Sequence, residues 1–255
     1  MQLSRIPSIL LIILLAASPV SAQTLPTFTI MTEDWEPYQF KEGPELRGIT
    51  VDLVTEILKR TGSAQSRKDI QLLPWARAYR SISKTENTLL FSMIRTPERE
   101  SLFRWVGPLF MDTTYLIGSK KQKIKITSPD DLRSYHIGTL VDDASEMFLT
   151  RLGLDQKQFM RNTNSQSNLR MLDRGRIDFI VAGWEAILSD AKATGLNPDD
   201  FEKAYTVDSS EVSIAFHKET PDWIIQKFQQ ALNNIKAEGL YDRIFEKYNL
   251  SKPVE

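Results

Sequence analysis

The chain has 255 residues, of which 41% are hydrophobic and 25% are charged, which excludes disordered, collagen-like and multi-span membrane proteins. Its 32 Lys and Arg residues nearly balance 33 Asp and Glu residues, so the net charge of −1 gives no reason to expect binding to nucleic acid or an anionic membrane. The sequence has no cysteine and two histidines, His136 and His217, which we expect on strands. Disulfides and Cys-ligated metals are excluded, and we expect neither a metal nor a cofactor.

The first 22 residues predict a secretory signal peptide. Arg5 is their only charge, an apolar run follows over residues 9–17, and Val20-Ser21-Ala22 supplies a small-residue end. The run is about half of the roughly 20 apolar residues that a transmembrane helix needs. Cleavage near Ala22–Gln23 would leave 255 − 22 = 233 residues with a charge of 31 − 33 = −2, and we expect this mature chain in the periplasm.

The first part of the mature chain alternates between strand and helix patterns. Strands are expected over residues 27–31, 69–73 and 88–92, and a helix over residues 51–60 before Gly62. Pro74 opens a second helix whose apolar residues at 75, 78, 79 and 82 share one face. This alternation predicts a mainly parallel sheet with helices on its faces.

The rest of the chain repeats this plan. Helices are expected to begin at Ser128-Pro129, at Asp143 in a capping-box pattern, and at Thr220-Pro221. Further helices are expected over residues 169–174, 184–193 and 240–248, and strands over residues 136–139, 177–182 and 212–216. Two α/β units without a flexible linker predict two lobes joined by extended crossings near residues 111–114 and 209–212. We assign residues 23–112 and 211–255 to lobe 1 and residues 113–210 to lobe 2. A small ligand is expected in the cleft between them.

The run from Phe91 to Arg99 is the first candidate for chemistry. Thr96 is a good N-cap and Pro97 a good first helical residue, so free N–H groups and Arg99 could form an anion site that suits a carboxylate. The alternative is a capped surface turn with solvated arginines.

Five motifs occur in order along the mature chain: Glu36-Pro37-Tyr38, residues 46–53 (LRGITVDL), Thr96-Pro97-Glu98-Arg99, residues 105–109 (WVGPL) and residues 175–178 (GRID). On these residues the sequence resembles the bacterial family 3 extracellular solute-binding proteins, periplasmic receptors for polar amino acids. The resemblance implies a two-lobed periplasmic-binding-protein-like (type II) α/β fold, hinge closure around a solute, and delivery to an ABC-type permease. Residues 74–78 (PWARA) resemble a less-studied branch of this family.

The resemblance also implies site residues. Arg99 matches the arginine that grips the ligand's carboxylate, Ser92 a serine of the pocket, and Trp35 the aromatic residue that lies over the ligand. Trp75 and Arg77 fall beside a pocket-lining position. For Trp35 a packing role, and for Arg77 a solvated helix face, stay open as alternatives.

Lobe 2 departs from the amino-acid-receptor pattern. Asp142 and Asp143 stand where those receptors have Gly-Thr, and Gly183 stands where an aspartate holds the ligand's ammonium group. Asp143 is interpreted as an N-cap paired with Glu146. Our hypothesis is that Asp142 or Glu185 supplies the displaced anion.

Three functions compete for this fold. We expect a non-catalytic, monomeric receptor for a small carboxylate-bearing solute, with an amino acid, opine-like compound, dicarboxylate or polyamine all compatible. An exported enzyme resembling cyclohexadienyl dehydratase would use Asp142, Glu185 or Glu33 as a general acid, although no nucleophile–base pair is recognisable. A sensory module would use the same pocket and report to a membrane sensor.

Overall fold

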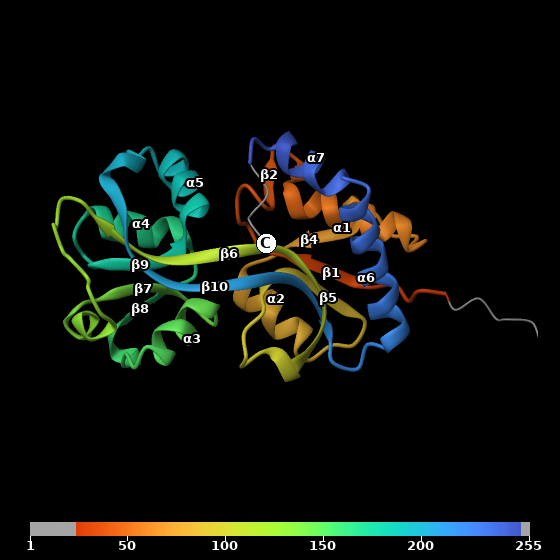
Figure 1. Ribbon diagram of the computed structural model, residues 1–255, viewed down its shortest axis with the longest axis horizontal. Helices are drawn as coiled ribbons and strands as arrows, with labels where there is room; N and C mark the ends of the chain where they lie inside the picture. The colour runs from red at the N-terminus through yellow and green to blue at the C-terminus, as the bar shows by residue number, and fades with distance from the viewer. Residues whose placement is uncertain (1–23, 251–255) are drawn as a thin grey trace, which may run out of the picture.

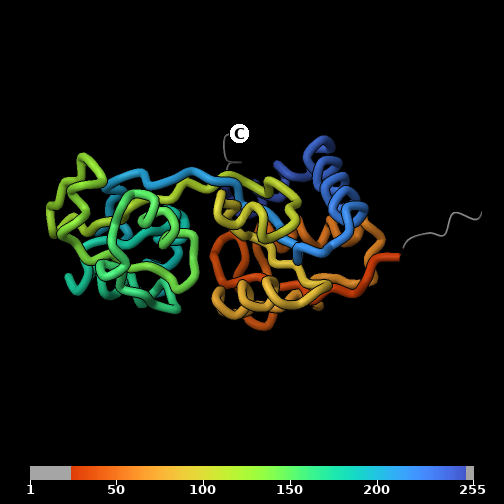
Figure 2. Tube along the Cα trace, turned by 90° about the horizontal axis from the view of Figure 1, so that it is seen from below, coloured from red at the N-terminus to blue at the C-terminus, as the bar shows by residue number. Residues whose placement is uncertain are grey.

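A computed structural model describes residues 24–250, so the predicted signal peptide and its cleavage site lie outside the described residues. Two lobes lie side by side, and two long strands run from one lobe into the other along one side of the molecule (Figures 1 and 2). Within residues 24–250 no helix combines the length and the apolar character needed to cross a membrane.

One eight-stranded sheet passes through both lobes. Its strands, in spatial order, are β4 (Ile70–Leu72), β1 (Thr29–Thr32), β5 (Thr88–Ile94), β10 (Phe201–His217), β6 (Phe103–Ser119), β9 (Phe179–Gly183), β7 (Ile137–Leu140) and β8 (Phe159–Asn162). Strand β1 is parallel to β4 and β5, and β7 is parallel to β8 and β9, whereas β10 and β6 run antiparallel to their neighbours. The mainly parallel sheets that the sequence predicts are therefore present.

The two extended crossings are the centres of β6 and β10. These strands pair along most of their length, with Met111 opposite Glu211 and Asp112 opposite Ser210. Buried apolar residues gather in separate clusters on either side of this point, one set drawn from residues 28–110 and 212–245 and the other from residues 116–201. The lobe boundaries at residues 112 and 210 stay predictions.

Helices cover the sheet on both lobes (Figure 1). On the first lobe lie α1 (Ile49–Arg60), α2 (Trp75–Ile82), α6 (Asp222–Ala237) and α7 (Leu240–Lys247); on the second lie α3 (Ala144–Arg151), α4 (Ser165–Asp173) and α5 (Trp184–Thr194). Shorter elements are the hairpin β2 (Phe40–Glu42) and β3 (Glu45–Arg47) and the 3₁₀ helices Arg67–Asp69, Glu100–Leu102, Pro129–Ser134, Gln156–Gln158 and Pro198–Asp200.

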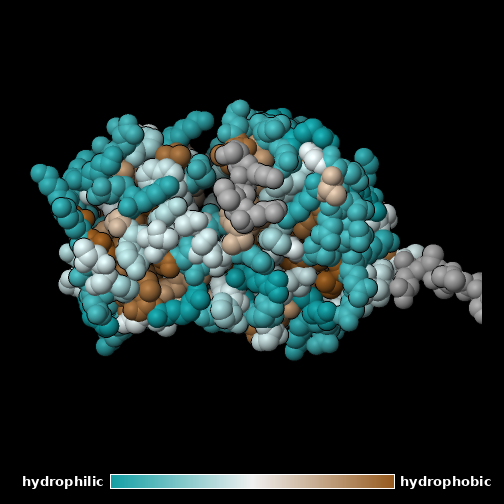
Figure 3. All heavy atoms as spheres, viewed as in Figure 1, coloured by the Kyte–Doolittle hydropathy of each residue, from teal (hydrophilic) through white to brown (hydrophobic). Residues whose placement is uncertain are grey.

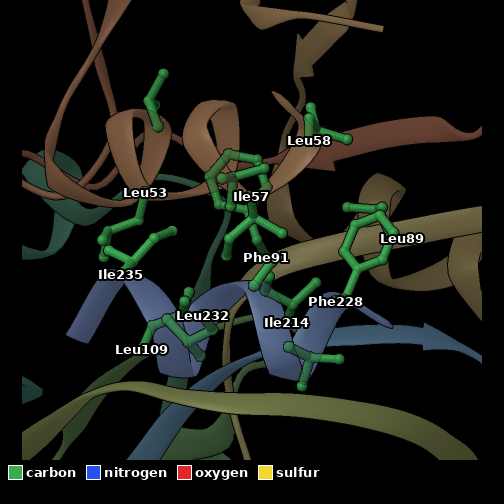
Figure 4. Packing of buried hydrophobic residues seen from close by; sticks show 14 of the residues in the cluster. Leu53, Ile57, Leu58, Leu89, Phe91, Leu109, Ile214, Phe228, Leu232 and Ile235 are labelled. Atoms are coloured by element: carbon green, nitrogen blue, oxygen red, sulfur yellow. The ribbon is translucent and has the colours of Figure 1, made fainter. Parts of the chain in front are cut away.

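The larger core lies between α1, α6 and the sheet. Leu53 and Ile57 of α1 face Leu232 and Ile235 of α6, and all four side chains are fully buried (Figure 4). Burial of a leucine or isoleucine contributes about 1.5–3 kcal/mol, so this layer fixes the position of the first lobe's strands.

On the face shown in Figure 3 hydrophilic residues predominate.

Two residues of the motif at residues 46–53, Gly48 and Asp52, have structural roles in this lobe. At Gly48, which has φ +127°, a Cβ atom would lie 2.2 Å from the carbonyl oxygen of Tyr38, so a side chain there would clash with the main chain. Asp52 accepts hydrogen bonds from Arg67, Lys247 and the Tyr248 hydroxyl, and it thereby ties α1 to the end of α7.

The capped helix start predicted at Ser128-Pro129 is present, as a 3₁₀ helix. Three other local predictions are wrong. No α-helix begins at Thr96, because β6 starts at Phe103 and the eight residues between β5 and β6 form a turn and one short 3₁₀ helix. Glu146 does not close a capping box, because its carboxylate binds Arg161 and Thr139 instead. His136 precedes β7, whereas His217 ends β10 as predicted.

Candidate ligand-binding site

A cavity of about 460 Å³ lies between the lobes. The first lobe contributes residues 33–36 at the carboxyl end of β1, residues 72–76 at the start of α2, and Ser92 and Ile94 of β5. Asp112 and Thr114 of β6 form the wall at the crossing. The second lobe contributes residues around the start of α3 and α4, the end of β9 and one face of α5. The volume of the cavity is in the range of small-molecule binding sites.

The charged side chains of this cavity are all acidic. Six carboxylates line it, and no lysine, arginine or histidine does; the acids are Glu33, Asp34, Glu36, Asp112, Asp143 and Asp190. Within residues 24–250 none of the six forms an ion pair. No group of three acidic or histidine residues in the described part of the chain is arranged to hold a metal ion. The lining therefore carries a net negative charge, which basic side chains outside the lining, Arg99, Lys41 and Arg170, oppose without forming an ion pair with it.

Three of the acids, Glu33, Asp112 and Asp143, form what we call the inner acidic group. Burial raises the pKa of Asp112 to about 7, and the charges of Asp143 and Glu185 act in the same direction. Burial also raises the pKa of Glu33 well above its usual range, and Asp143 adds to the effect while nearby Arg99 opposes it. These acids come from the first lobe, the crossing and the second lobe, so the inner acidic group spans the cleft.

Asp112 occupies space that a side chain at position 183 would need. It pairs with Ser210 in the sheet, and its carboxylate lies over Gly183 at the end of β9. A Cβ atom on Gly183 would lie 3.0 Å from Oδ1 and 3.2 Å from Oδ2 of Asp112. The Asp112 carboxylate from the crossing strand thus fills the space beside Gly183, the position that the family resemblance aligns with an ammonium-binding aspartate.

The remaining acids, Asp34, Glu36 and Asp190, form the outer acidic group. Asp190 lies on α5 and is mostly buried, and burial raises its pKa to about 6. A hydrogen bond with Ser165 opposes this rise, whereas the charges of Asp34 and Glu36 from the other lobe reinforce it. The outer acidic group therefore also draws on both lobes.

Aromatic and hydroxyl groups complete the wall. Trp35, Trp75 and Phe148 line the cavity, and Trp35 packs edge-on against Tyr38 with ring centroids 5.0 Å apart. Ser92, with φ +62°, donates a hydrogen bond of 2.9 Å to Oε1 of Gln39 and so has its hydroxyl fixed by a buried partner.

Arg99 joins the two lobes directly behind the wall. Its guanidinium is fully buried beside the stacked rings of Trp75 and Tyr79, at 5.1 and 5.0 Å from their centroids. Nη1 donates to the carbonyl of Ile94 at 3.2 Å and Nη2 to the carbonyl of Asp142 at 3.0 Å, while Nε is buried without a partner. Trp75 Nε1 donates to the same Asp142 carbonyl at 2.8 Å. Two donors from the first lobe therefore converge on one acceptor in the second.

The structure separates the residues that the sequence selects. Trp35, Ser92 and Trp75 line the cavity. Arg99, Asp142, Thr96, Arg77 and Glu185 are not among the lining residues.

Each of the others has a different place. The Asp142 carboxylate is 44% exposed and lies 3.9 Å from Arg161, Thr96 is buried with its hydroxyl 3.6 Å from the Met147 sulfur, and Arg77 is on the exposed face of α2. Glu185 lies within electrostatic reach of Asp112. Asp143 caps α3 by accepting from the Ser145 N–H, as predicted, and it also lines the cavity.

Asp112 and Asp190 are the residues that sequence reasoning missed. The available signal was an acid within an otherwise apolar and hydroxyl-bearing crossing strand, Phe110-Met111-Asp112-Thr113.

Comparison with known proteins agrees with this architecture. The model of the bacterial extracellular solute-binding proteins, family 3, matches residues 28–251. The chain is 25% identical over 225 residues to the "Probable histidine-binding protein" of Campylobacter jejuni, which covers 85% of this chain and 82% of that protein. It is 24% identical over 227 residues to an arginine-binding extracellular protein of Bacillus subtilis, covering 84% and 82%.

Solved structures show the same fold. An ancestral arginine-binding protein bound to arginine superposes with a TM-score of 0.73 at 22% identity, covering 87% of this chain and 97% of that one. A histidine kinase sensor domain with similarity to periplasmic binding proteins superposes with a TM-score of 0.77 at 16% identity, covering 89% and 99%. With a family model that matches almost the whole described chain, the protein belongs to the bacterial extracellular solute-binding proteins, family 3.

Proposed function

We propose that the chain is a periplasmic receptor that captures a small polar solute in the inter-lobe cavity and delivers it to a membrane transporter of the ABC type. The observation that carries the proposal is the cavity itself, which takes its walls from both lobes and from the strand that connects them. The relatives whose names include histidine and arginine binding support a solute of the amino-acid class.

Closure follows from how the binding groups are divided between the lobes. A solute that first contacts Trp35 and Glu33 on one lobe gains contacts with Asp143 and Asp190 only when the other lobe approaches, so binding favours the closed form by that difference. The bonds from Arg99 and Trp75 to the Asp142 carbonyl belong to this closed form. A permease can then distinguish a loaded receptor by the relative position of its lobes.

A thermal-shift screen of the mature chain from Gln23 tests the proposal, with amino acids, amines and small carboxylates as probes. A solute at 100 times its Kd stabilises the protein by about 2.7 kcal/mol. We expect one chemical class to raise Tm, with one-to-one binding by calorimetry and an unchanged mass of the recovered solute. Conversion of the solute would identify an enzyme instead, and a library without any stabilising member would contradict the receptor function.

Trp35→Ala provides the variant for this screen. Because Trp35 lines the cavity, its removal should reduce the thermal shift that the solute produces. Trp35 also packs against Tyr38 and Phe110, so the Tm of the unliganded variant is measured alongside and the shift is taken relative to it. Trp105→Ala is the matched control, since Trp105 lies outside the cavity lining.

A further inference from the structure

We infer that the solute is an organic dication without a carboxylate, such as the decarboxylated form of a basic amino acid, with one cationic end in each acidic group of the cavity. The inference rests on the proposed function and specifies its substrate. It departs from a carboxylate-bearing ligand, which the family resemblance implies.

The charge of the cavity is the first argument. Six carboxylates without an ion-pair partner surround a space of about 460 Å³ to which no basic side chain contributes. A ligand carboxylate placed there would meet like charges from both lobes, whereas ammonium or guanidinium groups would be attracted by them. The absence of a metal-holding arrangement among residues 24–250 favours an organic cation over an inorganic one.

The division of the acids is the second argument. Asp112 is within electrostatic reach of Asp143, and Glu33 is within reach of Asp143, which defines the inner acidic group. Asp190 is within electrostatic reach of Asp34 and Glu36, and Asp34 also acts on Glu33, so the two groups adjoin along residues 33–36. Acids from both lobes and from the crossing strand line one cavity, and this distribution matches a ligand with a cationic nitrogen at each end.

The third argument is that the candidate carboxylate anchor lies outside the cavity lining and is directed to main-chain carbonyls. Both Nη atoms of Arg99 donate to such carbonyls, one of them in the opposite lobe, and the guanidinium packs beside the stacked rings of Trp75 and Tyr79, with Nε unpartnered. The Asp142 carbonyl of the second lobe thus accepts the hydrogen bond from Arg99 across the cleft. Because this bond already links Arg99 to the second lobe, a ligand carboxylate is not needed for that link.

The uncharged wall fits the same ligand. Ser145 lines the cavity, is 2% exposed, and has a hydroxyl without a hydrogen-bond partner, so its oxygen can accept from an ammonium or guanidinium group. Trp35 and Phe148 offer aromatic surface to the methylene chain between the two cationic ends and cation–π contacts to those ends.

Two matched pairs of probes test the inference, because the members of each pair differ by one carboxylate. Agmatine is compared with arginine, and cadaverine with lysine, by isothermal titration calorimetry on the mature chain at pH 8. We expect the amine of at least one pair to bind at least tenfold more tightly than its amino acid. Asp112→Asn and Asp190→Asn should each weaken that amine at least tenfold, whereas Asp199→Asn, which removes an exposed acid outside the cavity, should not change its affinity.

The results of these titrations distinguish a wrong ligand class from a wrong receptor function. Tighter binding of arginine or lysine than of the corresponding amine would overturn the inference and leave the receptor function standing. Binding of some other screened solute, but of no dication, would do the same, as would an amine whose affinity survives both cavity substitutions. Failure of every amine, amino acid and carboxylate to bind would instead contradict the receptor function itself.

Discussion

Asp112→Asn should make the unliganded protein more stable at alkaline pH. The carboxylate is buried beside other acids, and the interval between the ordinary aspartate pKa of 3.8 and about 7 in the folded chain corresponds to about 4 kcal/mol. Because the folded state holds this proton more tightly than the unfolded state, stability falls as pH rises from about 4 to about 7. Asparagine has no such charge, so the difference between variant and wild type should be near zero at pH 4 and about 2–4 kcal/mol at pH 8.

Thermal unfolding of the mature chain, followed by circular dichroism at pH 4 and pH 8, measures this difference. For a chain of this size about 1 kcal/mol corresponds to about 2–4 °C, so we expect Asp112→Asn to unfold about 5–10 °C above wild type at pH 8. Asp199→Asn, an exposed acid, should follow wild type at both pH values. An Asp112→Asn protein that is no more stable than wild type at pH 8 would refute the reasoning that this acid opposes folding and is retained for a cationic ligand.

Three further predictions concern binding of the solute selected by the thermal-shift screen, measured by calorimetry. Trp75→Phe keeps an aromatic ring but loses the hydrogen bond to the Asp142 carbonyl, so affinity for the solute should fall about fivefold. Trp105→Phe loses a hydrogen bond within its own lobe and should leave the affinity unchanged. Equal effects of the two variants would contradict a role of the Trp75–Asp142 hydrogen bond in holding the lobes together. Gly183→Ala should displace the Asp112 carboxylate and weaken binding of the solute about tenfold. In a protein that already carries Asp112→Asn, the same substitution should weaken binding much less. Additive effects of the two substitutions would contradict a contact between position 183 and the Asp112 carboxylate. Affinity for a dication should rise about tenfold from pH 6 to pH 8, because Asp112, with a pKa of about 7, must lose a proton on binding, and a flat profile would contradict its role.

The sequence predicts the architecture well where a local pattern repeats. Apolar spacing in the helix at residues 51–60 and the capping signals at Asp143 correspond to α1 and α3, and the extended crossings lie at the centre of β6 and β10. Capping residues predict a helix poorly where the distance between two strands leaves too few residues to form one. Thr96-Pro97 is a good helix start, yet the eight residues before β6 leave room only for a turn.

The site is only partly predictable for a related reason. Trp35, Ser92 and Trp75 line the cavity as the family resemblance implies. The local signal for Asp112, an acid in an otherwise apolar and hydroxyl-bearing strand, does not identify it as a site residue. Its importance depends on the missing side chain at Gly183, a residue on another strand 71 positions along the chain (183 − 112). Arg99, which the motif assigns to a ligand carboxylate, lies outside the cavity lining, and its partners, the Ile94 and Asp142 carbonyls, follow from the tertiary structure alone.

A crystal structure of the mature chain with the solute that gives the largest thermal shift would show where that solute binds. We predict that the solute lies in the inter-lobe cavity, in contact with Trp35 of one lobe and Asp190 of the other, with a cationic nitrogen within hydrogen-bond distance of the Asp112 carboxylate. A solute bound outside this cavity, or held by one lobe alone, would contradict it.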